Sequence, residues 1–318
     1  MTEIHPLTGM ETERWAHPSL LIVATDLTDL DLLMPFAFDQ AAQSGARLIL
    51  LHVLASGTGL AVDESGMPSY DPASALEYAA RTMEPWCAAA HKQSIGCDAL
   101  VREGHAARQI VSAARQFHAD RILLGARGRN RLSQLLLGSV TEQVLRSVQL
   151  PVMTVGPEAR LAEGASEQEK VVLYATLLRE ASRPSAALAG QLAADQGVKL
   201  VLLHVLPPED RTMHKTPLSG LDSVVLHELS QLAAETVARE AEPVVAHGNP
   251  VIEILAASVA LHASLIVLSA AEHTGLDRLT RDRTVCRVLA HARCPVLTLH
   301  EPLAQPVATG AKPLALHK

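Results

Sequence analysis

Residues 149–155 read QLPVMTV, and residues 293–299 read RCPVLTL. Each stretch is a proline followed by a short run of aliphatic and β-branched residues, and an offset of 144 residues relates the two prolines. The tetrapeptide LHVL also occurs twice, at residues 51–54 and 203–206, at a slightly larger offset. Self-similarity of this kind indicates a duplicated unit, so the chain is first read as two copies of one fold.

Further matches keep the same order along the chain. Residues 118–122 (HADRI) match residues 262–266 (HASLI), and LIVATDLT at 21–28 matches VVLYATLL at 171–178. Chance similarity of aliphatic strands is the alternative explanation. The shared histidine and proline positions argue against it, as does Gly104, which matches Gly248 at the offset of 144.

Apolar runs and amphipathic stretches alternate within each copy. In the first copy the predicted strands are Leu20–Thr25, Arg47–Leu54, Ala99–Arg102, Arg121–Gly125 and Val152–Val155. The predicted helices between them are Leu32–Ser44, Ala73–Gln93, Ala107–Phe117 and Val140–Ser147. This alternation predicts an α/β fold with two tandem doubly wound, Rossmann-like domains, each with a parallel sheet. A chain of 318 residues with 48% hydrophobic and 3% aromatic residues suits two such aliphatic cores.

The copies are expected to form domains at residues 1–158 and 159–302, with a tail at 303–318. The polar stretch 156–170 contains Gly and Pro and lacks periodic apolar residues, so it is predicted to be a linker.

Composition limits the classes of function. A net charge of −7 argues against a nucleic-acid-binding surface. The four cysteines have no CxxC spacing, which is typical of free thiols in a reducing compartment. The polar, acidic N-terminus lacks the apolar region of a secretory signal, and no apolar run reaches membrane-spanning length. We therefore expect a cytoplasmic protein with no membrane partner.

The segment 124–142 (LGARGRNRLSQLLLGSVTE) runs from the end of a predicted strand to the start of a predicted helix. Gly125 and Gly128 allow sharp turns and close approach of a ligand to the backbone. Ser139 precedes Glu142 by three residues, which is capping-box spacing and predicts Ser139 as an N-cap. Free N–H groups at a helix start bind anions. The segment lacks GxxxxGK[ST], so it is not a P-loop.

Glycine spacing alone is weak evidence, since it also occurs in ordinary tight turns. Here Gly125, two residues, Gly128, nine residues, Gly138 and then Ser139 resemble the universal stress protein family in its ATP-binding branch. The resemblance extends over nearly the whole first copy and, more weakly, over the second. It implies five-stranded parallel sheets, a stress-related role and an adenine nucleotide ligand, expected to be ATP, with ADP and AMP as alternatives.

The resemblance also implies roles for individual residues. The implied nucleotide-binding residues are Ala24, Thr25, Asp26, Val53, Leu124, Gly125, Arg127, Gly128, Arg131, Gly138, Ser139 and Val140. Asp26 would reach the ribose or adenine, and Val53 would meet the adenine through its backbone. A helix N-cap is the alternative for Asp26, and a solvated loop is an equal alternative for both arginines. Mg²⁺ is expected with the phosphates, although no metal-ligating cluster can be identified.

The second copy lacks the motif. At the offset of 144, the residues that replace Gly125, Gly128, Gly138 and Ser139 are Ser269, Glu272, Asp282 and Arg283. The match of residues 21–28 with 171–178 aligns Thr176 with Asp26. Two replacements would place carboxylates near phosphate oxygens, which costs roughly a few kcal/mol at an intermediate dielectric. We expect this copy to keep the fold without binding ATP.

Two expectations concern assembly and function. The strands at 152–155 and 296–299 are predicted to pair antiparallel, as related single domains pair, giving an intramolecular pseudo-dimer and leaving homodimerisation open. The favoured function is nucleotide-dependent regulation of conformation or of an unknown protein partner. A slow ATPase or nucleotide hydrolase and a purely structural module are the alternatives, and no catalytic residues are identified because no base is evident.

Overall fold

The computed structural model describes most of the chain. The described residues are 9–55, 60–62, 68–70, 72–126, 137–161, 170–179, 182–206, 219–271 and 278–301. The predicted tail at 303–318 lies outside them, as does most of the predicted linker. Within the described ranges, every helix falls short of the length or apolar character that a membrane crossing requires.

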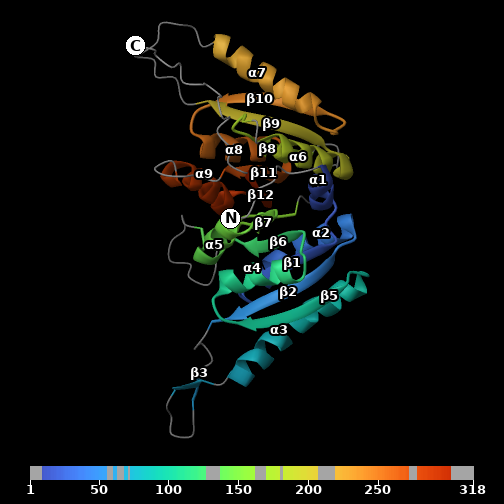
Figure 1. The fold of residues 1–318 in the computed structure, drawn as a ribbon, viewed down its shortest axis with the longest axis vertical. Helices are drawn as coiled ribbons and strands as arrows, with labels where there is room; N and C mark the ends of the chain where they lie inside the picture. The colour runs from blue at the N-terminus through green and yellow to red at the C-terminus, as the bar shows by residue number, and fades with distance from the viewer. Residues whose placement is uncertain are drawn as a thin grey trace, which may run out of the picture.

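The first copy alternates strands and helices along the chain (Figure 1). Its elements are α1 (Gly9–Ala16), β1 (Leu20–Thr25), α2 (Leu30–Ser44), β2 (Arg47–Leu54), β3 (Leu60–Val62), β4 (Pro68–Tyr70), α3 (Pro72–Lys92), β5 (Cys97–Glu103), α4 (Ala106–Gln116), β6 (Arg121–Gly125), α5 (Ser139–Ser147) and β7 (Val152–Val155). The short strands β3 and β4 form a separate antiparallel ribbon.

The second copy repeats this order from β8 onward. Its elements are β8 (Val171–Ala175), α6 (Arg183–Gln196), β9 (Lys199–Leu206), α7 (Ser219–Ala234), β10 (Ala241–His247), α8 (Pro250–Ala260), β11 (Ala263–Ala271), α9 (Arg278–His291) and β12 (Val296–Glu301). The duplication inferred from the sequence therefore extends to every main strand and to the helices between them.

Ten strands form one sheet in the order β10-β9-β8-β11-β12-β7-β6-β1-β2-β5. Within each copy all neighbouring strands are parallel. The copies meet where β12 pairs antiparallel with β7, with Leu297 opposite Met153. The doubly wound α/β fold and the antiparallel pairing of the last strands are both confirmed.

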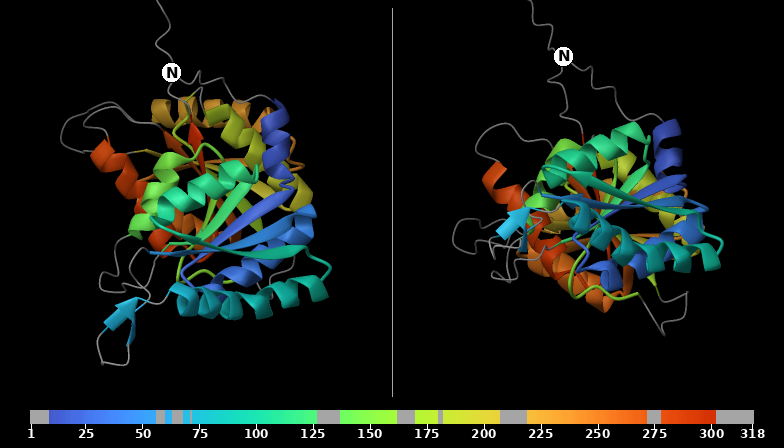
Figure 2. Two further views of the ribbon diagram at one scale, coloured as in Figure 1. Left: turned by 60° about the horizontal axis from the view of Figure 1, so that its bottom comes forward. Right: turned by 90° about the horizontal axis from the view of Figure 1, so that it is seen from below.

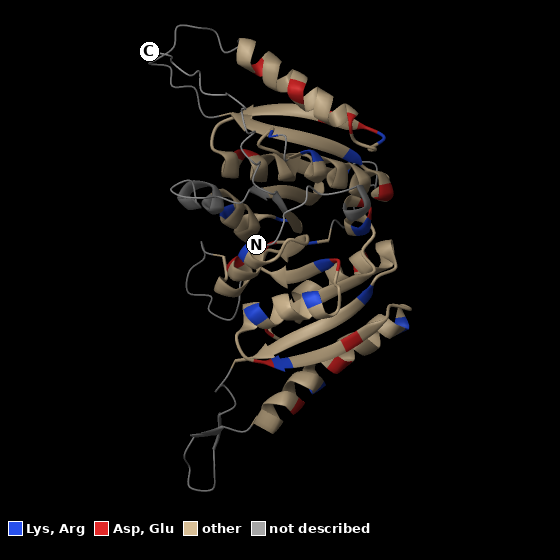
Figure 3. Ribbon diagram, in the orientation of Figure 1, with Lys and Arg blue, Asp and Glu red and all other residues tan. Residues whose placement is uncertain are grey.

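Helices cover both faces of the sheet (Figure 2), and an aliphatic core lies beneath them on each face. One face is covered by α2, α3, α6 and α7, and the other by α4, α5, α8 and α9. Each core contains residues of both copies, so apolar packing continues across the β7–β12 junction. Strands buried on both faces explain the continuous apolar runs of the sequence. Described charged residues lie mostly on helices, at strand ends and on the edge strands (Figure 3).

The copies also share unusual backbone positions. His118 and His262 follow the C-terminal ends of α4 and α8 with φ of 53° and 51°. Gly104 and Gly248, with φ of 123° and 144°, precede the same two helices. Positive φ is uncommon outside glycine, and asparagine, aspartate and histidine are enriched there. The repeated histidines of the sequence thus have a structural explanation at the end of a helix.

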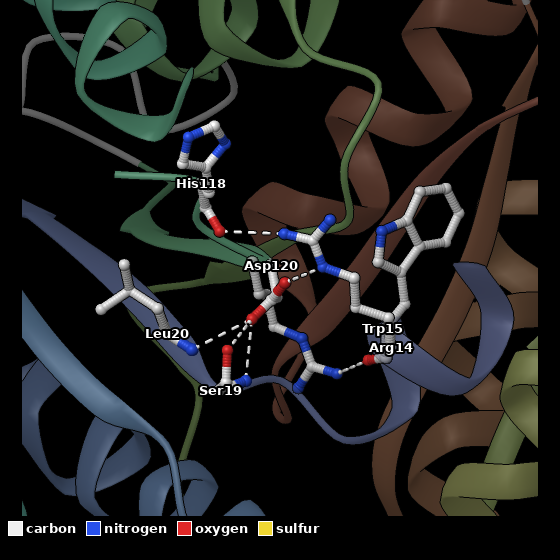
Figure 4. A network of polar contacts seen from close by, with 7 residues as sticks. Arg14, Trp15, Ser19, Leu20, His118 and Asp120 are labelled. Carbon is white, nitrogen blue, oxygen red and sulfur yellow. Dashed lines mark hydrogen bonds and ion pairs between the residues drawn. The ribbon is translucent and has the colours of Figure 1, made fainter. Parts of the chain in front are cut away.

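Helix α1 was not expected from the polar N-terminal sequence. Its Trp15 is buried, and its Arg14 forms an ion pair with Asp120 at the start of β6 (Figure 4). The guanidinium of Arg121, which is fully buried, donates to the carbonyl of Trp15 at 2.6 Å. Beyond this network, His17 lies 3.7 Å from Asp195 at the end of α6. His17 directly follows α1, and α1 itself packs against α6, so this helix contacts both copies.

Asp120 is the centre of this network. Its Oδ2 accepts hydrogen bonds from the backbone N–H and hydroxyl of Ser19, at 2.8 and 2.7 Å, and from the N–H of Leu20 at 3.1 Å. Burial alone would raise the pKa of Asp120, but these bonds and Arg14 together hold it below its usual value. The carboxylate thereby fixes the start of β1 beside the start of β6.

Candidate functional site

The strand order of the first copy has a switch point between β1 and β6. From β1 the chain moves outward to β2 and β5, and then returns to place β6 and β7 on the opposite side. Ala24 of β1 is paired with Leu124 of β6 next to the ends of both strands. Ligands of doubly wound sheets bind beyond the carboxyl ends of the strands at such a point. Residues following β1 and β6 are therefore the first candidates for a site.

Thr25 organises the end of β1. Its hydroxyl accepts a hydrogen bond from the N–H of Leu27 at 2.9 Å and donates to Asp29 Oδ1 at 2.6 Å. Its carbonyl accepts from Nδ1 of His52 on the neighbouring strand β2, at 2.9 Å. Leu27 has φ of 74°, so the chain turns sharply directly after the strand. His52 is buried and hydrogen-bonded, which makes it a packing residue.

Asp26 lies in this turn beside the switch point. Its Oδ1 accepts hydrogen bonds from the backbone N–H of Thr28 at 2.9 Å and from the Thr28 hydroxyl at 2.6 Å. The N-cap position of α2 is occupied by Asp29, which makes no side-chain capping bond. The alternative explanation of Asp26 as a helix N-cap is therefore wrong, and its side chain orders the loop after β1 instead.

Asp29 is a second carboxylate next to Asp26. Burial, chiefly, and the charge of Asp26 raise the pKa of Asp29 to about 6, against the hydrogen bond from Thr25, which lowers it. Asp29 was not singled out from the sequence. Only its position, three residues after Asp26, could have indicated a role.

On the other side of the switch point, α5 begins next to the end of β6. The Thr141 hydroxyl donates to the carbonyl of Gly125 at 2.7 Å, and the N–H of Gly138 donates to the carbonyl of Ala126 at 2.8 Å. These two bonds hold the first turn of α5 against the end of β6. Thr141 was also missed in the sequence, although its place in the first turn of α5 favours contact with the preceding loop.

The prediction that Ser139 is an N-cap is wrong. The cap is Gly138, with φ of −62° and ψ of 139°, and Ser139 is the first helical residue. A capping box would need Glu142 to reach back to the cap, but its carboxylate lies 2.6 Å from the guanidinium of Arg146 instead. Ser139 and Val140 are exposed at the first turn, where backbone N–H groups have no partner within the helix.

The structure places nine of the predicted site residues. Ala24, Thr25 and Asp26 lie at the end of β1, Val53 lies near the end of β2, Leu124 and Gly125 end β6, and Gly138, Ser139 and Val140 begin α5. They lie at or near the carboxyl ends of three adjacent strands, β6, β1 and β2, and at the start of α5. Arg127, Gly128 and Arg131 lie outside the described residues.

The equivalent turn in the second copy corrects the alignment of Asp26. The hydroxyl of Thr176 accepts from the N–H of Leu178 at 3.1 Å, and its carbonyl accepts from His204 at 2.9 Å. These are the bonds of Thr25 in the first copy, so Thr176 corresponds to Thr25 and not to Asp26. Leu177 therefore occupies the position of Asp26, and the second copy has no carboxylate there.

A tyrosine bridges the strand ends of the second copy. Tyr174 on β8 is fully buried, and its hydroxyl donates to the carbonyl of Ser182 at 3.0 Å. The same hydroxyl lies within hydrogen-bond distance, 3.1 Å, of the hydroxyl of Ser269 on β11. By the register just given, Tyr174 corresponds to Val23 in the first copy. A side-chain contact thus joins β8 to β11 in the second copy, whereas the corresponding residues of the first copy, Val23 and Gly125, have no side-chain hydrogen-bonding group.

Helix α9 differs from α5 in where it begins. It starts at Arg278, five residues before the position that corresponds to the start of α5. Asp282 and Arg283 therefore lie inside the helix, where backbone N–H groups bond within the helix. Their side chains lie outside the described part of the chain, as does all of Glu272.

Comparison with known proteins agrees with this geometry. The sequence profile of the universal stress protein family matches residues 20–156 and, a second time, residues 169–300. The chain belongs to the universal stress protein family. It contains two consecutive domains of that type.

Individual relatives match shorter stretches. The chain is 33% identical over 81 residues to a universal stress protein of Methanocaldococcus jannaschii, which covers 26% of this chain and 44% of that protein. It is 35% identical over 65 residues to the stress response protein NhaX of Bacillus subtilis, covering 20% of this chain and 39% of that protein. These matches span less than half the length of either relative.

Solved structures share the tandem fold over most of the chain. A universal stress protein from Archaeoglobus fulgidus superimposes with a TM-score of 0.66 at 17% identity, covering 89% of this chain and 98% of that one. A protein of unknown function from Pseudomonas aeruginosa gives a TM-score of 0.62 at 16% identity, covering 91% and 95%. At these identities the likeness concerns the fold.

Proposed function

We propose that this universal stress protein binds an adenine nucleotide, ATP, at the switch point of its first domain and does not bind one in its second. The observation that carries the proposal is the difference between the two switch points. In the first domain, α5 begins beside Gly125, and its first two residues, Ser139 and Val140, are exposed. In the second, Tyr174 and Ser269 are bonded across the strand ends and α9 starts earlier.

The chemistry of the first domain suits a nucleoside polyphosphate. Unpaired N–H groups at a helix start and the positive end of its dipole stabilise phosphate oxygens. Asp26, next to the end of β1, would accept hydrogen bonds from ribose hydroxyls, and the backbone of Val53 on β2 would face the base. Arg127, Gly128 and Arg131, in the segment between β6 and α5, would supply further contacts to the phosphates.

A Mg²⁺ ion would accompany the phosphates and neutralise part of their charge. Mg²⁺ commonly keeps several water ligands and takes the rest from phosphates and one or two carboxylates. Among the described residues no cluster of three metal-ligating side chains is present. The ion is therefore proposed to arrive with the nucleotide, and no protein cage is assigned to it.

The proposed role is regulatory. A ligand that binds one conformation more tightly shifts the population toward it, and can thereby change contacts with a protein partner. A cytoplasmic location is also proposed, since all four cysteines are free thiols.

Val140→Glu is expected to weaken nucleotide binding without destabilising the fold. Val140 is the second residue of α5 and is 36% exposed, and a carboxylate near a helix N-terminus stabilises the helix. The same carboxylate would lie close to the phosphates. Isothermal titration of the full chain with Mg-ATP should show affinity reduced at least about tenfold, with thermal stability equal to or slightly above that of wild type.

A matched control is available in the second domain. Ile252 is also exposed in the first turn of a helix, α8, so Ile252→Glu introduces the same charge far from the proposed site. It should leave ATP affinity unchanged. Equal affinity of Val140→Glu and wild type would contradict the proposal, as would an equal loss in Ile252→Glu. Gly128→Glu tests the loop itself, and phosphate release measured on the same samples distinguishes a binder from an ATPase.

A further inference from the structure

Cys87 and Cys97 form a pair of thiols that the nucleotide site does not use. Cys87 lies in α3, and Cys97 is the first residue of β5, the edge strand of the sheet in the first domain. Their sulfur atoms are 2.7 Å apart. This separation is well inside the ~3.5–4.0 Å typical of non-bonded heavy-atom contacts and approaches the ~2.05 Å of a disulfide bond.

The surroundings hold the two sulfurs in place. Met83 and Ala90 of α3 are fully buried, and the turn between α3 and β5 is closed by a hydrogen bond from the N–H of Ile95 to the carbonyl of Ala90, at 3.0 Å. The N–H of Cys97 donates to Nε2 of His91 at 3.3 Å. The pair is thus part of a packed corner between α3 and the edge of the sheet.

The two thiols are not chemically equivalent. The hydrogen bond from Cys97 lowers the pKa of Cys87, although burial and the charge of Asp98 act in the opposite direction. The same hydrogen bond and burial raise the pKa of Cys97. Cys87 is also the more exposed sulfur residue, at 8% against 4%. Cys87 is therefore the thiol that can become a nucleophilic thiolate, and Cys97 is placed to react with it afterwards.

We propose that Cys87 and Cys97 are an oxidation site that hydrogen peroxide converts into an intramolecular disulfide, joining α3 to β5. The small exposed areas exclude a bulky disulfide oxidant and admit a small neutral peroxide. The proposal is independent of nucleotide binding. It is specific to the first domain, because Ala241 occupies the position of Cys97 in the second.

The reaction balances with one peroxide. The thiolate of Cys87 attacks one peroxide oxygen, the O–O bond breaks, and the departing hydroxide takes a proton to become water, leaving a sulfenic acid on Cys87. The sulfur of Cys97 then attacks the sulfur of Cys87. The thiol proton and the sulfenic hydroxyl leave as a second water while the S–S bond forms. Two thiols lose two electrons, and the peroxide is reduced to two waters.

The other buried cysteine provides a contrast. Burial raises the pKa of Cys294 to about 12, which disfavours its thiolate. Cys294 should therefore stay reduced under conditions that oxidise the pair.

Peptide mapping of the full chain tests the proposal directly. The reduced protein is treated with hydrogen peroxide, denatured with an alkylating reagent and digested with trypsin, which cleaves between the two cysteines after Lys92. The expected product is a linked pair of peptides, Thr82–Lys92 and Gln93–Arg102, which dithiothreitol separates. Recovery of both peptides alkylated at cysteine, or of Cys87 as sulfinic acid without a link, would overturn the proposal.

Thermal unfolding gives a second readout. The disulfide should raise the midpoint of the wild-type protein by about 5 °C over its reduced form, because it restricts the unfolded chain. Cys97→Ala should show neither the link nor the increase after peroxide, whereas Cys294→Ala should show both. An equal increase in Cys97→Ala would contradict the assignment, and the wild-type peptide map stands even where a variant folds poorly.

Discussion

Asp29 should destabilise the folded protein at neutral pH, and removing its charge should stabilise it. The carboxyl group lies at the N-cap of α2, where it accepts a hydrogen bond from the Thr25 hydroxyl and faces the charge of Asp26. Asn retains the oxygen that accepts from Thr25 and loses the charge. Asp29→Asn therefore isolates the cost of ionising this half-buried group.

The magnitude follows from the pKa. Burial raises the pKa of Asp29 from 3.8 to about 6, which corresponds to about 3 kcal/mol of preference for the protonated form in the folded state. The unfolded chain releases this proton first, so wild-type stability falls as pH rises from about 4 to about 6 and stays lowered above that range. A negative charge at a helix start returns roughly 0.3–1 kcal/mol. We expect Asp29→Asn to be more stable by about 2 kcal/mol at pH 7.5.

Urea unfolding of both proteins at pH 7.5 and pH 4.5 measures this effect. The difference in the free energy of unfolding should be about 2 kcal/mol at pH 7.5 and fall to about 1 kcal/mol or less at pH 4.5, where the folded carboxyl is protonated and only the unfolded one is largely ionised. Asp31 is exposed in the first turn of the same helix, and Asp31→Asn should lower stability slightly at pH 7.5. A gain in Asp29→Asn that is the same at both pH values, or a loss at pH 7.5, would refute the reasoning.

Two further substitutions test the network at α1 and the loop beside β6. Asp120→Ala should lower the free energy of unfolding by about 3 kcal/mol, because two backbone N–H groups and the Ser19 hydroxyl lose their buried acceptor. The side chain of Arg14 is 55% exposed, so Arg14→Ala should lower the free energy of unfolding by less than about 1 kcal/mol in the same urea assay. Thr141→Val should cost about 1–2 kcal/mol and weaken ATP binding, since the Gly125 carbonyl loses its donor. Thr141→Ser keeps the hydroxyl and should retain both properties; equal behaviour of the two variants would contradict this role.

Strand positions could be predicted closely because the strands are buried on both faces. The runs Leu20–Thr25, Arg47–Leu54, Arg121–Gly125 and Val152–Val155 were predicted with the bounds that the structure shows. Each is almost uninterrupted in aliphatic residues, and burial in a parallel sheet requires that composition. β5, an edge strand with exposed positions, was predicted too short for the same reason.

Features that depend on contacts between distant residues could not be predicted. The alignment of Asp26 with Thr176 was off by one residue, because two aliphatic strands can be aligned one residue apart and still match in hydrophobicity. The hydrogen bonds of Thr25 and Thr176 fix the correct register. Ser139 matched a capping pattern that its surroundings do not use. Helix α1 has a polar sequence, and its ordering comes from the burial of Trp15 and from contacts with β6.

The place of most predicted site residues in the fold could be inferred from the sequence. The placement of residues from β1, β2, β6 and α5 at one edge follows from the topology, and the sequence motif indicated that topology. Tyr174 was overlooked, because a tyrosine within an apolar strand resembles any other core residue until its hydroxyl is seen to reach Ser269.

The antiparallel contact of β7 with β12 has a consequence for how the molecule behaves on dilution. The two strands belong to one polypeptide, so their pairing is a unimolecular event whose effective concentration is set by the connecting chain. The pairing of the two strands is therefore independent of the protein concentration. Because both domains are translated as one chain, every molecule contains one domain of each kind.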